Sequence, residues 1–297
     1  MSNLIRGLVL LGLVPRFAAS QDVRLAAYLN DSTYFEGEPI YVVVELANRG
    51  PDTAWTRPLD LVSGTLRGLV LSGGEPLPEF VAVSHYMPLP GERGEPIAPG
   101  ESTYRSFVLQ SRWGHPGELY RTLFLQHLPP GEYTFLASFV PDDRVGNLGA
   151  RVEGAPVAFR VRARLGSEED SYVAVKQLGA IVRDPSRRNV VLSEMIAWCQ
   201  SRLRADSGDP FVPYVLSDGL GIARGRGIAP SAGQSQDLLR MQGTLLRFYA
   251  TSSTGALLTY AEPLRTSSAL DSAIAQADVS SLVRSVVRSR RRTSKGQ

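Results

Sequence analysis

Apolar and polar positions alternate with a period of two in several short runs between residues 23 and 164. In the stretch PIYVVVELANRG, one face of an extended chain would carry Ile40, Val42, Val44 and Leu46. A period of two is the pattern of a strand with one buried face. Further runs of this kind occupy 66–71, 103–110, 120–126, 133–140 and 156–164. Turn segments such as FEGEP, APGES and LPPGEY separate them, which favours an antiparallel sandwich.

The apolar spacing becomes helical after about residue 165. Helices are predicted at about 168–183, 188–204, 210–224, 234–251 and 269–291. Ser167, followed by Glu168, Glu169 and Asp170, predicts a capping box at the first of these helices. The chain is therefore predicted to be α+β with two domains, an antiparallel Greek-key β-sandwich followed by an irregular α-helical domain. The expected bounds are 21–164 for the sandwich, 165–283 for the helical domain and 284–297 for a basic C-terminal tail.

One short motif refines the sandwich prediction. Leu128, Pro130, Gly131 and Tyr133 have the spacing of a tyrosine corner, in which the tyrosine hydroxyl bonds to upstream backbone and holds a Greek-key crossover. With this motif and its strand pattern, the N-terminal half resembles the immunoglobulin-like and fibronectin-like sandwich domains of exported bacterial proteins. The resemblance implies a fold and no particular activity. In the C-terminal half, SRLRADSGDPFVPYVLSDGLG resembles the link between helices of helical-repeat proteins, but the half has no fixed repeat period.

The N-terminus has the three regions of a secretory signal. Arg6 is its positive region, 7–14 its apolar region, and Ala18, Ala19 and Ser20 are the small residues before a cleavage point. An apolar helix over 7–14 would span ~12 Å, far less than a hydrocarbon core of ~30 Å, so no transmembrane helix is predicted. Residues 1–20 are interpreted as a signal peptide or an N-terminal membrane-contacting segment, with a buried strand or helix as the alternative. The expected location is the periplasm or the outer face of a bacterial membrane.

Charge adds a second feature to this picture. After Asp278 the sequence has no acidic residue, and its basic residues are Arg284, Arg288, Arg290, Arg291, Arg292 and Lys295. Such a segment can associate with an anionic membrane. A solvated, frayed tail is the simpler interpretation.

The sequence shows no catalytic constellation. The only histidines are His85, His115 and His127, and apart from the weak pair His115 and Glu118 they lack partners at metal-ligand spacing. The segment GLGIARGRG lacks the ending of a phosphate-binding loop. The single cysteine, Cys199, is in step with apolar neighbours at helical spacing, so it is predicted to be a buried apolar group. No enzyme activity, cofactor, metal or nucleic-acid partner is therefore predicted. The acidic pairs Asp142 with Asp143 and Asp206 with Asp209 are interpreted as turn formers, with calcium binding as the alternative.

A long Pro-rich excursion from 73 to 101 contains aromatic residues, which are interpreted either as buried beneath a loop folded over the sheet or as contacts to a partner. The candidate contacts are Phe80, His85, Tyr86 and Trp113, together with the six basic residues after 283. The preferred hypothesis is a non-catalytic exported binding or scaffold protein that meets a protein partner at a membrane surface. An extrinsic subunit of a membrane-associated complex, such as an energy-converting complex, is one form of it. The alternatives are an exported hydrolase or carbohydrate-binding protein that uses the 73–101 loop, and a structural envelope protein.

Overall fold

The computed structural model describes residues 22–61, 64–78, 94–111, 115–116, 126–140, 151–187, 190–220, 227–258 and 280–295. One sheet has the antiparallel order β1 (Val23–Leu29), β3 (Tyr41–Asn48), β8 (Ser102–Val108). The second has the order β2 (Thr33–Phe35), β13 (Val157–Arg162), β11 (Gly131–Phe139), β5 (Leu66–Ser72), β6 (Glu75–Pro76), with β12 (Val152–Glu153) on β11. Strand β2 joins β13 in parallel, whereas the other pairs in this sheet are antiparallel. Two small pairs complete the strands: β4 (Ala54–Thr56) with β7 (Glu95–Ile97), and β9 (His115–Pro116) with β10 (Gln126–His127).

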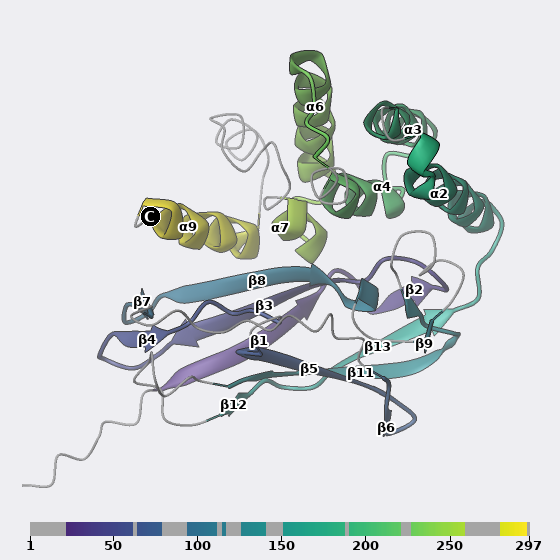
Figure 1. The fold of residues 1–297 in the computed structure, drawn as a ribbon. Helices are drawn as coiled ribbons and strands as arrows, with labels where there is room; N and C mark the ends of the chain where they lie inside the picture. Colours follow the sequence, from purple (N-terminus) through teal and green to yellow (C-terminus); the bar gives the residue numbers. More distant parts are fainter. Residues whose placement is uncertain are drawn as a thin grey trace, which may run out of the picture.

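The helices lie together on one side of the sheets (Figure 1). They are α2 (Ser167–Arg183), α3 (Val191–Ala205), α4 (Phe211–Tyr214), α6 (Ala232–Phe248), α7 (Ser253–Leu258) and α9 (Ser281–Lys295). Short 3-10 turns form η1 (Leu109–Ser111) and η2 (Pro185–Arg187), and a π-helical turn, η3 (Val215–Gly219), continues α4. Helix α7 contacts β3 and β8, and α9 contacts β8. The mixed α+β content is as predicted. No described helix is both long enough and apolar enough to cross a bilayer.

Strand β3 is buried on both faces, which explains how the two kinds of element meet. Val42 and Val44 belong to a core that both sheets enclose, in which Phe135 and Val70 of the second sheet also lie. The alternate residues face the helices, and Tyr41 belongs to a second core shared with α2, α3, α4 and α6. A strand has two faces, so burial of both places β3 in the middle of three layers.

Several predicted elements differ from those observed. The capping box expected at Ser167 is not formed, since Ser167 is the first residue of α2 and its N-cap is Gly166, with no side-chain cap bond. The Glu168 carboxylate instead accepts a hydrogen bond from the Leu165 amide at 2.8 Å. A capping box occurs at α6, where Ser231 and Gln234 bond reciprocally. Helix α7 was not predicted.

Other predicted segments are described only in part. Most of the 120–126 strand lies outside the described residues, as do residues 259–279, within which the last predicted helix was to begin. The central part of the 73–101 excursion lies outside them too, but its two ends are strands β6 and β7. Gly73 and Gly74, with φ of 59° and 89°, form the turn that folds β6 back onto β5.

Candidate functional site

Helix α9 contains the predicted basic contact residues and packs on the first sheet. Val283, Val286 and Val287 are buried in a cluster that includes Val43 of β3. Arg284 and Arg288 are exposed one helical turn apart. Residues 284–295 of the predicted 284–297 tail belong to a helix, and its three valines at helical spacing bury an apolar face, so the frayed interpretation does not hold for 284–289. The same helix continues through the other predicted basic contacts, Arg290, Arg291, Arg292 and Lys295. The structure describes the backbone of these four residues and not their side chains.

The remaining predicted contacts are not brought into a described site. Phe80, His85, Tyr86 and Trp113 all lie outside the described residues. Cys199 is fully buried in the helical core, where burial raises the pKa of its thiol. Its position matches the predicted role as an apolar group rather than a nucleophile.

The tyrosine-corner residues hold the start of β11. The Tyr133 hydroxyl donates a hydrogen bond to the Pro129 carbonyl oxygen at 2.7 Å, which is the upstream bond that the spacing with Leu128, Pro130 and Gly131 predicts. Its ring stacks on Phe159 of β13 with centroids 5.3 Å apart. These residues support the sheet and carry no reactive group.

A pocket that the sequence did not reveal lies where the ends of the sheets meet the helices. Its volume is about 430 Å³, and we call it the junction pocket. Its walls come from the β1–β2 and β2–β3 turns, from β2, β3 and the end of β13, and from the helical layer: the start of α2, the α3–α4 link, the end of α6, the α6–α7 link and the start of α7. Its charged residues are Asp31, Glu38, Arg162, Glu168 and Asp206, its aromatic residues are Phe35, Tyr41, Phe248 and Tyr249, and its other polar or small residues are Asn30, Thr33, Ser167, Ser171, Gly208, Pro210, Ser252 and Thr254.

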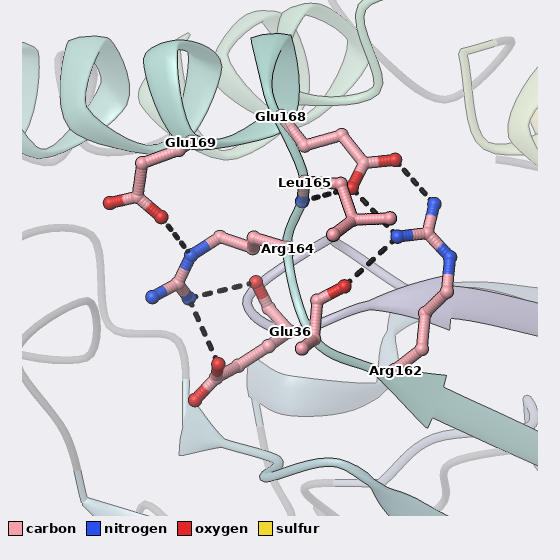
Figure 2. Close-up of polar contacts among 7 residues, drawn as sticks. Glu36, Arg162, Arg164, Leu165, Glu168 and Glu169 are labelled. Carbon is pink, nitrogen blue, oxygen red and sulfur yellow. Dashed lines mark hydrogen bonds and ion pairs between the residues drawn. The ribbon is translucent and has the colours of Figure 1, made fainter.

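Arg162 and Glu168, which both line the junction pocket, form an ion pair (Figure 2). Arg162 Nη1 donates to Glu168 Oε2 at 2.7 Å, and Nη2 donates to the other oxygen of the same carboxylate. This two-point contact lowers the pKa of Glu168. The positive charge of Arg162 is thus matched within the wall itself.

Arg164 ties the start of α2 to the β2–β3 turn (Figure 2). Its Nε donates to Glu169 at 2.6 Å, and its Nη1 donates to the backbone carbonyl of Glu36 at 3.1 Å. The same guanidinium lies over the Tyr172 ring, 3.9 Å from its centroid. The helix that supplies Glu168 is therefore held against the turn that supplies Glu38.

Glu38 is the acidic residue of the junction pocket whose pKa is raised by its surroundings. Burial raises its pKa to about 7, and the negative charges of Asp31 and Glu168 add to the rise. A hydrogen bond from the Phe35 amide to Oε2, at 2.9 Å, and the charge of Arg162 oppose it. The side chain can therefore change charge near neutral pH.

Three hydroxyls complete the polar lining. Those of Tyr41 and Tyr249 donate to the carbonyl oxygens of Pro210, at 2.6 Å, and Gly208, at 2.9 Å. Thr254 is fully buried, and its Oγ1 has no hydrogen-bond partner among the described residues. Buried hydroxyls usually have a hydrogen-bond partner, so the Thr254 hydroxyl is a group beside the pocket that can still form a hydrogen bond.

The described residues contain no group of three or more His, Cys, Asp or Glu side chains placed to hold a metal ion. Asp209, considered above for calcium, accepts hydrogen bonds from Arg202 Nε at 2.7 Å and from the Phe211 amide at 2.9 Å. Asp206 accepts from the Gly208 amide at 2.8 Å. Both acids thus have structural bonds in the turn that leads into α4.

Comparison with known proteins identifies no family. No protein-family model matches the chain, and no curated protein matches it. Among solved structures, the sporulation control protein Spo0M from Bacillus subtilis is similar with a TM-score of 0.27 and 14% sequence identity. The matched region covers 52% of this chain and 55% of that one, little more than half of each. A similarity this low supports no conclusion about fold or function.

Proposed function

We propose that the protein is an exported, non-catalytic binding protein that docks on an anionic membrane surface through α9. The observation that carries this proposal is the fixed orientation of that helix. Its valines are buried against the first sheet, so the exposed Arg284 and Arg288 project from a packed surface and not from a flexible tail.

The proposed architecture is an immunoglobulin-like Greek-key sandwich followed by a helical domain. Its support is the strand order, in which β1-β3-β8 corresponds to strands A, B and E of such sandwiches and β5-β11-β13 to strands C, F and G. The bond from Tyr133 to Pro129 lies at the start of the strand that corresponds to F, where a tyrosine corner is found. Export is proposed from the signal-like residues 1–20 alone.

Docking through α9 would be electrostatic. The apolar face of this helix is already covered by the sheet, so it has little hydrocarbon surface to insert into a bilayer. Each basic residue near an anionic surface contributes about 1 kcal/mol, and the attraction decays within a Debye length of about 10 Å at 0.1 M salt. Membrane association is therefore expected to be reversible and sensitive to salt. An extrinsic subunit of a membrane complex would use the same contact.

Vesicle sedimentation tests the proposal with the full chain. The protein is expected to bind vesicles of phosphatidylglycerol and phosphatidylcholine at low salt, and not vesicles of phosphatidylcholine alone. The double variant Arg284→Glu/Arg288→Glu should bind at least about 10-fold more weakly. The matched control Arg67→Glu/Arg160→Glu makes the same change in net charge at exposed positions on β5 and β13 of the second sheet. Equal loss in both double variants, or equal binding to both kinds of vesicle, would show that α9 is not the docking surface.

A further inference from the structure

We propose that the junction pocket binds a small organic cation, with an ammonium group paired to Glu38 and its hydrocarbon part against Phe248 and Tyr249. This site is separate from the exposed face of α9, and the inference does not depend on membrane docking. Its volume of about 430 Å³ lies at the lower end of the range for small-ligand pockets, about 300 to 1,000 Å³.

The hydrogen bonds that the lining side chains already make favour a ligand that donates hydrogen bonds. The Tyr41 and Tyr249 hydroxyls already donate to backbone carbonyls, and Arg162 donates to Glu168. Only one Glu38 oxygen, Oε2, has a hydrogen-bond donor among the described residues, which leaves Oε1 as an acceptor. An ammonium group has three donors and no acceptor, so it can pair with the acceptor that Glu38 Oε1 offers.

The charges that surround Glu38 point the same way. Asp31 faces it from the β1–β2 turn, Glu168 from α2 and Asp206 from the α3–α4 link, against the single positive charge of Arg162 at the end of β13. Because Arg162 is matched by Glu168, the acids that remain give the pocket a negative balance. An anionic ligand would be repelled, and a cation would be attracted.

The apolar part of the lining suits an organic cation better than a bare metal ion. Phe248 is 55% exposed although it is large and apolar, and it meets the Tyr249 ring edge-on with centroids 4.8 Å apart. Aromatic faces attract ammonium groups and the hydrocarbon attached to them. The buried hydroxyl of Thr254, which has no hydrogen-bond partner within the described part of the chain, offers a further polar contact at this pocket.

Calorimetric titration with three related probes tests the proposal on the full chain. The probes are 2-phenylethylammonium, the neutral 2-phenylethanol and the anion phenylacetate, which share a ring and differ in charge. The ammonium is expected to bind at least about 10-fold more tightly than the alcohol, and phenylacetate more weakly than either. Glu38→Gln should abolish the preference for the ammonium. Glu132→Gln, at an exposed position on β11, is the matched control and should retain it.

The pH dependence separates Glu38 from the other acids. Because its pKa is about 7, the ammonium should bind about tenfold more weakly at about pH 6 than at about pH 8. This difference should vanish in Glu38→Gln, in which Asp31, Glu168, Asp206 and the tyrosines are unchanged. Thermal unfolding checks that the variant is folded. If it is not, Phe248→Ala, a change at an exposed ring, should lower the affinity for the ammonium several-fold.

Three outcomes would overturn the proposal. They are no binding of the ammonium up to about 10 mM, equal binding of the alcohol, and an undiminished preference for the ammonium in Glu38→Gln. Weak vesicle binding in the sedimentation experiment would leave this result unaffected, because the two surfaces share no residue.

Discussion

Tyr41 on β3 donates its hydroxyl hydrogen bond to the backbone carbonyl oxygen of Pro210, at 2.6 Å and across 169 residues of sequence. Its ring lies in the same core as Phe211 and Val212 of α4. The neighbouring residue, Val42, points the other way into the core between the sheets. Strand β3 thus joins the sandwich core to the helical layer through alternate side chains.

Removing this bond should weaken the whole structure. Tyr41→Phe keeps the ring but leaves the Pro210 carbonyl without its side-chain donor, so the free energy of unfolding is expected to fall by about 1 to 2 kcal/mol. Urea denaturation measures the change. Tyr28→Phe is the control, because Tyr28 is exposed and its hydroxyl bonds to the Glu45 carboxylate at 2.8 Å. The control should change stability by about 0.5 kcal/mol or less. Equal losses in the two variants would contradict the structural role given to Tyr41.

The β2–β3 turn should not tolerate a side chain at Gly37. This residue has φ of 85°, and a Cβ built there would lie 2.7 Å from Cε2 of the Tyr172 ring, which the Arg164 guanidinium covers from 3.9 Å. Gly37→Ala is expected to lower the free energy of unfolding by about 2 kcal/mol or more, from backbone strain together with the clash.

Gly73→Ala provides the comparison for this test. Gly73 also has positive φ, 59°, but a Cβ there would meet no atom within 4 Å. Gly73→Ala therefore tests backbone strain alone, and its free energy of unfolding is expected to fall by about 1 kcal/mol. Equal losses for both variants would contradict the clash that the structure predicts between a side chain at position 37 and the Tyr172 ring.

The stability of the protein should depend on pH through Glu38. Its pKa is about 7 in the folded protein and near 4.5 when unfolded, so between these values the folded state holds a proton that the unfolded state has lost. The free energy of unfolding should therefore fall as pH rises from about 4.5 to about 7, by up to about 3 kcal/mol from this group. Glu38→Gln lacks this titration. The free energy of unfolding of the variant minus that of the parent should therefore be larger at about pH 8 than at about pH 5. Urea denaturation of both proteins at the two pH values measures it, and parallel pH profiles would contradict the assignment.

Local patterns predicted many individual elements well. The alternation around Ile40 to Leu46 predicts a strand that the structure places at 41–48, and the helix predicted at 168–183 is observed at 167–183. Both patterns arise within one element, where side-chain period and backbone geometry are directly linked. The capping prediction at Ser167 failed because α2 already begins at Ser167, with Gly166 as its N-cap, and Glu168 accepts the hydrogen bond from the Leu165 amide.

The junction pocket was beyond the reach of such patterns. Its lining residues extend from Asn30 to Thr254, and Glu38 by itself is only an acid in a turn segment. The altered pKa of Glu38 arises from burial beneath helices that follow it by more than a hundred residues. No spacing rule links such distant positions.

The sequence by itself determined the strand and helix periods, the burial of Cys199 and the gathering of basic residues at the C-terminus, because each is a property of neighbouring residues. Only the tertiary structure decided that β3 is covered on both faces, that the basic segment is anchored by its valines and that a carboxyl group with a raised pKa lies in a pocket. These features depend on which segments, distant in sequence, pack against one another. Periodicity is a property of the local sequence, whereas burial and the electrostatic surroundings of a side chain are set by that packing.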